Sequence, residues 1–376
     1  MEKSILVVAD YYDSKQNAGG APVSIQNLLT ILNKFGYKTI VITRNKIFNS
    51  KNKFVSKKEK INYRENQIIY YIDGFLPIVL FKKFRELSFS MIYLNSFFST
   101  LTIFTFFYFS LFHIRKKIVV SPKGELFYGA LHSHNFIIKR IYIAIFNTFF
   151  SKNVIFHFSS DEELLIANKF INVNKYHIAI DIYERNEMHT NVTNNKNEFN
   201  IIFLSRIDKK KNLLFACNIL SKLKLKINFD IYGTIADMQY FNECMNILAE
   251  NPDFINANYC GVLDKQEVGK TFSKYDLFLF PTKGENFGYV ILESLDSGCP
   301  IVLSLDNTLW NNLKDKDAGF NISLEDEEDW LIAISKIYNS KMNMDYKYVN
   351  GAMQYTKNNK LIKNAALDNL KIFENV

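Results

Sequence analysis

Two glutamates in the second half of the chain, Glu285 and Glu293, bracket a segment in which a strand gives way to a helix. The apolar run 277–280 is short and is closed by a proline, which is typical of a strand buried on both faces. A helix is predicted to begin near Gly288 and to end at Gly298. Ligands of such units collect at the carboxyl ends of the strands, where a helix N-terminus offers free backbone N–H groups to an anion. The loop that carries Glu285 is therefore a candidate anion site.

A second candidate group is cationic. Arg206 and Lys211 follow the apolar run 201–204 and precede a helix predicted around 213–225. Two cations beside free N–H groups can hold a diphosphate at the end of a strand. The alternative is an ordinary charged turn on the surface.

Taken alone, the spacing E-x7-E favours a solvated loop, because glutamate is common on helix surfaces. Its context reverses that interpretation. With Asn-Phe-Gly after Glu285 and Glu-Ser-Leu at Glu293, the segment resembles the signature of the family 4 (group 1) glycosyltransferases, retaining enzymes of the GT-B architecture. The stretch 205–212 likewise resembles that family's G-R-x4-K-G segment, with Ser205 for the first glycine and Asn212 for the last.

The resemblance implies a role for each of these side chains. Arg206 and Lys211 would neutralise the departing diphosphate, Glu293 would accept the ribose hydroxyls, and Glu285 would hold hydroxyls of the donor sugar. Preorganised cations stabilise a transition state in which a leaving diphosphate gains charge, so no metal ion or other cofactor is expected. The implied catalytic residues are Glu285, Arg206 and Lys211. The implied donor-binding residues are Gly19, Gly20, Arg206, Lys211, Gly233, Val262, Glu285, Asn286, Phe287, Gly288, Tyr289 and Glu293.

Weaker signals come from the first half of the chain. Gly19 and Gly20 lie between a predicted strand and helix, where glycine lets the backbone approach a bulky ligand, although a plain tight turn fits equally well. By resemblance they form the glycine loop that faces the donor. Lys123 stands where many family members have histidine and others arginine, and it is assigned with Glu125 to the acceptor side.

The chain is long enough for two cores, since it has 376 residues, of which 48% are hydrophobic and 22% charged. The predicted fold class is α/β of the GT-B type: two doubly wound Rossmann-like domains that face each other across a cleft, with a C-terminal helix that crosses back. The expected boundaries are 1–185 for an acceptor-binding domain, 186–199 for a linker, 200–350 for a nucleotide-sugar-binding domain, and 351–376 for a helical segment on the first domain.

The charge and the aromatic content predict an anionic membrane as partner. The net charge is +8, and the chain has 34 Phe and 21 Tyr. The lysine-rich stretch 46–60 contains two phenylalanines and is either a solvated loop or a lipid contact. No arginine-rich arm or aromatic RNA-binding signature is present, so nucleic acid is not an expected partner.

Stretch 87–114 has no charged residue and is long enough to span a membrane. Its Asn, Ser and Thr residues favour instead a strand at 91–94 and a buried or membrane-facing helix at about 100–113. The chain begins with Met-Glu-Lys and a strand rather than a signal peptide, and its four cysteines lack metal or redox spacing. We therefore expect a cytoplasmic protein that is peripherally associated with the inner face of the cell membrane.

These expectations define a function. The chain would be a hexosyltransferase that moves a sugar, with retention of the anomer, from a UDP- or GDP-sugar to a glycan acceptor. A lipid-linked acceptor in bacterial O-antigen or capsule synthesis fits the membrane signals. The alternative is a catalytically inactive GT-B chain that acts as a binding partner in a polysaccharide-assembly complex.

Overall fold

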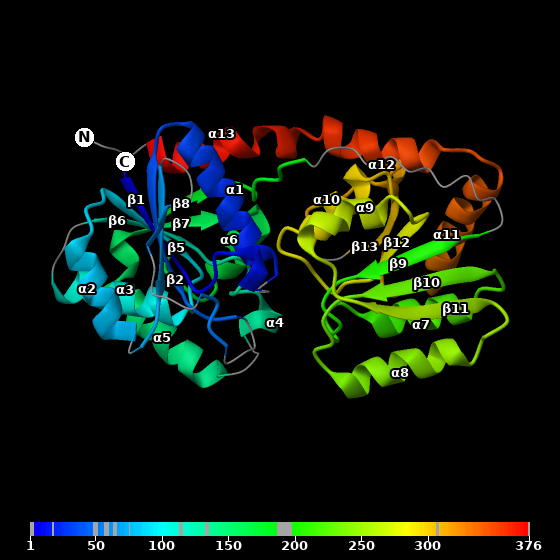
Figure 1. The fold of residues 1–376 in the computed structure, drawn as a ribbon, viewed down its shortest axis with the longest axis horizontal. Helices are drawn as coiled ribbons and strands as arrows, with labels where there is room; N and C mark the ends of the chain where they lie inside the picture. Colours follow the sequence, from blue (N-terminus) through cyan, green and yellow to red (C-terminus); the bar gives the residue numbers. More distant parts are fainter. Residues whose placement is uncertain are drawn as a thin grey trace. The chain divides into compact units, whose positions relative to one another are not determined.

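The chain forms two compact units (Figure 1). The first comprises Met1–Tyr183 together with Leu361–Val376, and the second comprises Glu184–Lys360. The structure is a computed structural model that describes residues 4–16, 19–47, 52–55, 60–62, 66–74, 76–112, 116–131, 135–185, 198–305 and 308–374. Most of the predicted linker, 186–197, lies outside these described residues.

The first unit is built on an eight-stranded sheet in the order β3-β4-β2-β1-β5-β6-β7-β8. All neighbouring strands are parallel except β3, which pairs antiparallel with β4. The strands are β1 (Ser4–Ala9), β2 (Lys38–Arg44), β3 (Lys60–Asn62), β4 (Gln67–Ile72), β5 (Met91–Asn95), β6 (Lys117–Ser121), β7 (Val154–Phe158) and β8 (Lys175–Ile178). The helices are α1 (Gly20–Lys34), α2 (Leu76–Glu86), α3 (Thr100–Leu111), α4 (Tyr128–Leu131), α5 (Phe136–Phe149), α6 (Asp161–Ala167) and α13 (Lys360–Glu374).

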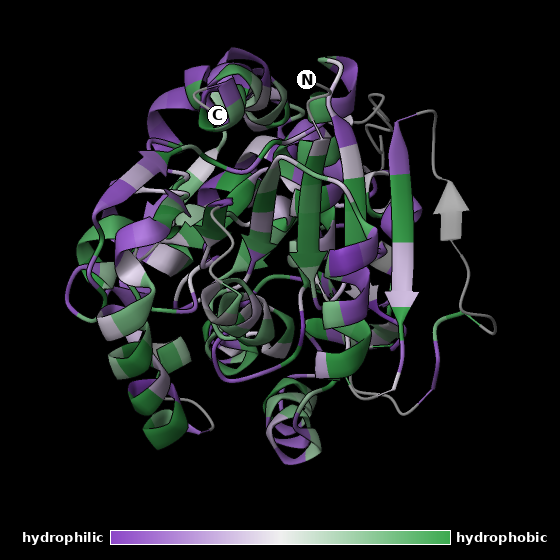
Figure 2. Cartoon of the chain, turned by 90° about the vertical axis from the view of Figure 1, so that its left-hand side faces the viewer, coloured by the Kyte–Doolittle hydropathy of each residue, from purple (hydrophilic) through white to green (hydrophobic). Residues whose placement is uncertain are grey.

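Helices cover both faces of this sheet, which explains why its central strands are buried at nearly every position. Successive side chains of β1 point to opposite faces. Leu6 and Val8 therefore join one core cluster with residues of α2, α3 and α5. Ile5 and Val7 join a second cluster with residues of α1 and α13. Figure 2 shows the central strands coloured as hydrophobic along most of their length.

The uncharged stretch 87–114 folds as predicted into a strand and a helix, β5 and α3. Ser99 caps α3 by accepting a hydrogen bond from the backbone N–H of Thr102 at 3.1 Å. Most large side chains of α3 are buried in the core of the first unit, whereas Phe107 is 43% exposed. Among the described helices, none has the length and apolar character needed to cross a bilayer.

The last helix, α13, belongs to the first unit, as the predicted fold requires. Phe373 packs edge-on against Tyr37, with ring centroids 6.3 Å apart, and lies 5.8 Å from the ring of Tyr93. Asn369 donates a hydrogen bond to the carbonyl of Ile180 at 2.8 Å. Ala365 and Leu370 complete this contact within the core cluster.

The predicted start of this segment at residue 351 was wrong, because residues 351–360 belong to the second unit. They form the end of α12 (Lys347–Asn358). A Cβ at Gly351 would lie 2.2 Å from the carbonyl oxygen of Asp317. Only glycine therefore allows α12 to pack this close to the backbone of Asp317. Thr356 also donates a hydrogen bond to Asp296 at 3.0 Å.

The second unit is built on a six-stranded, fully parallel sheet in the order β11-β10-β9-β12-β13-β14. Its strands are β9 (Asn200–Leu204), β10 (Ile227–Tyr232), β11 (Ile255–Gly261), β12 (Leu277–Phe280), β13 (Ile301–Ser304) and β14 (Gly319–Ile322). Its other helices are α7 (Leu213–Ser221), α8 (Met238–Ala249), α9 (Val268–Phe272), α10 (Tyr289–Asp296) and α11 (Glu327–Met342). The strand order reverses between β9 and β12, which makes this pair the topological switch point.

Candidate active site

The loops that follow β9 and β12 meet at the switch point of the second sheet. Because the two strands are parallel neighbours, their carboxyl ends lie side by side. The backbone N–H of Lys283, in the second loop, donates to the carbonyl of Lys210, in the first, at 2.9 Å. The structure thus brings together the two groups of residues that the sequence predicted to bind a donor.

Lys211 and Glu285 form an ion pair at the centre of this junction. Their side chains are only 15% and 13% exposed, so water screens the pair weakly. Thr282 donates a second hydrogen bond to Glu285, at 3.2 Å, and the Lys211 ammonium also lies 5.7 Å from the centre of the Phe280 ring. These two of the three predicted catalytic side chains are therefore preorganised.

Arg206 lies on the open side of the same loop, with 52% of its side chain exposed. Asp208 binds its guanidinium through Nε and Nη2, each at 2.6 Å. The other carboxylate oxygen of Asp208 accepts the backbone N–H groups of Lys210 and Lys211 at 3.0 Å. Asp208 was missed by the sequence interpretation, although an Asp directly before a turn is the usual signal for such bonds to the backbone.

The backbone of both loops requires residues that tolerate a positive φ. Asn212, which replaces the glycine of the family segment, has φ 61° just before α7, and asparagine adopts this left-handed conformation more readily than most residues. Gly288 has φ 76° just before α10. A Cβ there would lie 2.7 Å from the Cδ1 of Ile291, so the end of that side chain would have to move.

Aromatic packing fixes the loop between Glu285 and α10. The ring of Phe287 lies 4.6 Å from that of Tyr289 and 5.2 Å from that of Trp310, measured between centroids. The indole N–H of Trp310 donates to the carbonyl of Phe287 at 2.5 Å. Trp310 is fully buried and packs this loop. Asn286 lies half-buried between Glu285 and Phe287.

Gly233 brings the end of β10 against the end of β9. Its φ is 137°, and a Cβ would lie 1.8 Å from the carbonyl oxygen of Ser205, the residue before Arg206. The Gly233 N–H donates to the carbonyl of Gly261 at 2.8 Å, and the Tyr259 hydroxyl donates to the Gly233 carbonyl at 2.9 Å. This glycine therefore sets the spacing of three strand ends.

Glu293 lies in the middle of α10, where it is half-buried. Burial raises the pKa of its carboxyl to about 7, although the positive charge of Lys265 opposes the shift. No hydrogen bond to the Glu293 carboxylate is present among the described residues. Lys265 follows β11 by four residues and was missed by the sequence interpretation. The neighbouring Val262 is 64% exposed.

The predicted residues of the first unit lie in two places. Gly19 has φ 71° and immediately precedes Gly20, the first residue of α1, with open space around its Cβ position. Lys123 and Glu125 lie instead in the loop after β6. Glu125 accepts hydrogen bonds from the Ser96 hydroxyl at 2.6 Å and from the backbone N–H of Phe97 at 2.6 Å, so this carboxylate orders the loop before α3.

Lys123 belongs to a buried polar network that sequence reasoning did not find. Its ammonium pairs with Asp181, which also accepts the Ser24 hydroxyl at 2.8 Å. Burial alone would lower the pKa of Lys123, but the charge of Asp181 and neighbouring groups more than offsets that effect and raises it. His157, nearby, bonds the Tyr93 hydroxyl and the Ala179 carbonyl, each at 2.9 Å, and burial lowers the pKa of His157 to about 3.

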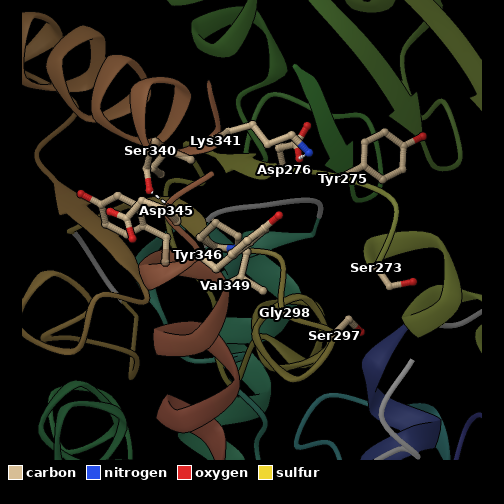
Figure 3. Close-up of a pocket in the computed structure, with 13 residues that line it drawn as sticks. Ser273, Tyr275, Asp276, Ser297, Gly298, Ser340, Lys341, Asp345, Tyr346 and Val349 are labelled. Carbon is tan, nitrogen blue, oxygen red and sulfur yellow. Dashed lines mark hydrogen bonds and ion pairs between the residues drawn. The ribbon is translucent and has the colours of Figure 1, made fainter. Parts of the chain in front are cut away.

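A separate cavity lies at the opposite edge of the second sheet (Figure 3). It is lined by Asp276 and Pro300, which immediately precede β12 and β13, and by residues of α11 and α12. Its volume is about 50 Å³, and Lys341 forms an ion pair with Asp276 at 2.7 Å on its wall. This cavity is remote from the strand ends that carry the predicted site. Within the described segments, no cluster of three or more His, Cys, Asp or Glu side chains could hold a metal ion.

Solved structures show the same fold. A structure of Anabaena Alr3699/HepE in complex with UDP-glucose matches with a TM-score of 0.72 and 11% identity, covering 99% of this chain and 100% of that one. WaaG, described as a glycosyltransferase involved in lipopolysaccharide biosynthesis, matches with a TM-score of 0.70 and 10% identity, covering 98% and 99%. Two parallel Rossmann-like sheets with this coverage define the GT-B fold of glycosyltransferases.

A family match covers most of the second unit. Residues 198–340 match the model of the family described as "Glycosyl transferases group 1". A relative described as an "uncharacterized 41.2 kDa protein in cps region" of Klebsiella pneumoniae is 24% identical over 268 residues, which are 67% of this chain and 70% of that protein.

Proposed function

We propose that this glycosyltransferase moves a hexose from a UDP- or GDP-sugar to a glycan acceptor and retains the configuration of the anomeric carbon. The observation that carries the proposal is the buried Lys211–Glu285 pair at the switch point, with the exposed guanidinium of Arg206 beside it. A diphosphate needs cations at this edge, and a sugar needs a carboxylate acceptor. The Lys211–Glu285 pair supplies both a cation and a carboxylate.

The proposed transfer uses the chain's own charges. The bond between the anomeric carbon and the diphosphate oxygen breaks while the acceptor hydroxyl oxygen bonds to that carbon on the same face. The proton of the hydroxyl passes to the leaving diphosphate. Lys211 and Arg206 stabilise the charge that grows on the diphosphate, and Glu285 holds the sugar hydroxyls in place. Because these cations neutralise the leaving group, we propose that no metal ion or other cofactor is required.

The remaining donor contacts are assigned from position. Glu293 accepts the ribose hydroxyls with a carboxylate that has no other described hydrogen-bond partner, and the loop of Val262 meets the base. The N–H groups of residues 286–288 face the sugar and phosphates. In the first unit, Gly19 and Gly20 approach the donor, and the loop of Lys123 and Glu125 lies on the acceptor side.

We further propose a lipid-linked acceptor in the synthesis of a bacterial surface polysaccharide, capsule or lipopolysaccharide, at the cytoplasmic face of an anionic membrane. The cps-region relative and the lipopolysaccharide glycosyltransferase of the same fold support this assignment. The aromatic content and the positive charge of the chain support it independently.

Thermal shift with a panel of nucleotide-sugars tests the proposal first. A ligand at about 100 times its Kd stabilises the folded state by about 2.7 kcal/mol, which is readily measured. Release of nucleotide diphosphate, with and without EDTA, then tests turnover and the absence of a metal requirement. Lys211→Met should abolish release. A chain that binds a donor but never releases nucleotide, with any acceptor extract, would instead be the inactive binding partner.

A further inference from the structure

One face of α5 exposes large apolar side chains to solvent. Ile137, Ile138, Ile141 and Phe149 are 72%, 64%, 57% and 68% exposed. Residues three and four apart are neighbours on a helix, so Ile137, Ile138 and Ile141 adjoin, and the half-buried Ile145 continues the row toward Phe149. We name these four exposed residues the α5 face. Isolated exposed apolar residues are ordinary, whereas a contiguous patch marks an interaction site.

The opposite side of α5 is fully committed to the core of the first unit. The ring of Phe146 lies 4.9 Å from that of Phe97 and 5.4 Å from that of Phe106, a residue of α3. Figure 1 shows α5 beside α3 on one side of the sheet. Phe107, the exposed residue of α3, packs against Phe150 at 5.8 Å and so extends the patch beyond α5. The patch is therefore held on a rigid support.

The charged residues on α5 and just after it are positive. Between residues 126 and 160 the sequence has no acidic residue, and the next exposed carboxylates are Asp161 and Glu162 at the start of α6. Arg140 lies on α5 itself and Lys152 just after it, and both are exposed. An apolar row flanked by exposed cations is complementary to a surface that is anionic outside and apolar beneath, which is the structure of an anionic lipid bilayer.

The position of the α5 face also relates it to the acceptor. The loop after β6, which carries Lys123 and Glu125, leads directly into α4 and then α5. Lys139 ties the two helices together by donating to the carbonyl of Ala130 at 2.6 Å. Tyr128, at the start of α4, is 72% exposed. The apolar surface thus extends from the carboxyl edge of the first sheet, where the acceptor is assigned.

We infer that the α5 face docks on an anionic lipid bilayer and there receives an acceptor that has an apolar tail in the membrane. This deepens the proposed function, on which it rests for the nature of the acceptor. It also relocates the membrane contact. The sequence pointed to the stretch 46–60 and to the helix after residue 100, but α3 buries most of its large side chains, and part of 46–60 lies outside the described residues.

The test is binding of the full chain to vesicles of phosphatidylglycerol, compared with vesicles of phosphatidylcholine, at two salt concentrations. Ile137→Glu with Ile141→Glu introduces two negative charges into the patch and should weaken binding at least about 25-fold. Arg140→Gln should weaken it about fivefold at low salt and little at high salt. Ile78→Glu is the matched control, because Ile78 lies on α2 of the same unit with a similar exposure of 67%.

Full binding by the Ile137/Ile141 variant, or equal losses in the Ile78 control, would overturn the inference. Failure of the wild-type chain to bind either type of vesicle would also overturn it. So would a double variant whose only change is from dimer to monomer in light scattering. Calorimetry with UDP and GDP on the same proteins separates this result from the proposed function. The α5 variants should bind nucleotide as wild type does, whereas failure of every variant to bind nucleotide would refute the donor site and leave the vesicle result intact.

Discussion

Replacement of Glu293 by glutamine should stabilise the protein and weaken its nucleotide binding at once. Burial raises the pKa of this carboxyl from 4.5 to about 7. Each pKa unit corresponds to about 1.4 kcal/mol, so ionising Glu293 in the folded chain costs up to about 3 kcal/mol. Because the folded-state pKa is the higher one, the folded chain binds the proton more tightly. The free energy of unfolding therefore falls as pH rises from about 4.5 to about 7, and is then constant with respect to this group.

Glutamine removes that dependence, since it carries no charge at any pH. The variant should be more stable than wild type at pH 8, by up to about 3 kcal/mol, and nearly equal to it below pH 4.5. The affinity of the variant for nucleotide should instead decrease. Loss of the charged acceptor should cost about 1.5–3 kcal/mol of affinity for the free nucleotide diphosphate. Wild-type affinity should itself decline as pH falls below about 7, because the ribose hydroxyls require the ionised carboxylate.

Urea denaturation at pH 5 and pH 8 measures the first effect, and titration calorimetry with UDP and GDP at the same pH values measures the second. Glu243→Gln on α8 is the matched control, because Glu243 is exposed and should change neither quantity. If the Glu293 variant gains no stability at pH 8, the carboxylate is not strained by burial. If it gains stability but binds nucleotide as wild type does, Glu293 does not hold the ribose.

Three other predictions concern the same unit. Glu285→Gln should still bind nucleotide diphosphate while kcat falls about a hundredfold, because the sugar is misplaced, and normal turnover would remove Glu285 from the site. Lys211→Met should weaken nucleotide binding. It should also lower the unfolding midpoint, because it leaves Glu285 half-buried without its cation. An unchanged Kd for UDP and GDP would contradict the phosphate role. Gly233→Ala should destabilise the chain by more than about 3 kcal/mol, because its Cβ would lie 1.8 Å from the Ser205 oxygen, and soluble expression with a wild-type melting temperature would refute that reasoning.

Local patterns predicted much of this structure. The strand at 91–94 and the helix at 100–113 were found within two residues, because apolar runs and polar interruptions act over a single element. Two separate helices, α4 and α5, follow each other in the next part of the chain. Asn135 has φ 64° just before α5, and no periodic pattern of apolar residues reports such a residue.

The parts of the site that the sequence did not predict depend on pairs of residues far apart in the chain. Lys123 meets Asp181 across 58 positions, and neither side chain carries a local signal for the other. The position of Lys265 near Glu293 follows from the arrangement of the loop after β11 beside α10. The start of the C-terminal segment was placed at residue 351 for a related reason: the sequence does not show that Gly351 packs closely against Asp317 of the second unit.

The placement of α13 has a consequence for synthesis of the protein. Leu370, Ile372 and Phe373 fill the same apolar layer as Ile5 and Val7, yet a ribosome makes them only after the whole second unit. The nascent first unit must therefore wait without the α13 part of this layer while about 180 further residues emerge, which takes roughly 10–40 s at 5–20 residues per second. During that interval the aromatic side chains Tyr37 and Tyr93, later covered by Phe373, are available to chaperones or to a neighbouring chain. The core of the first unit is thus completed by a helix that follows the whole second unit in the chain.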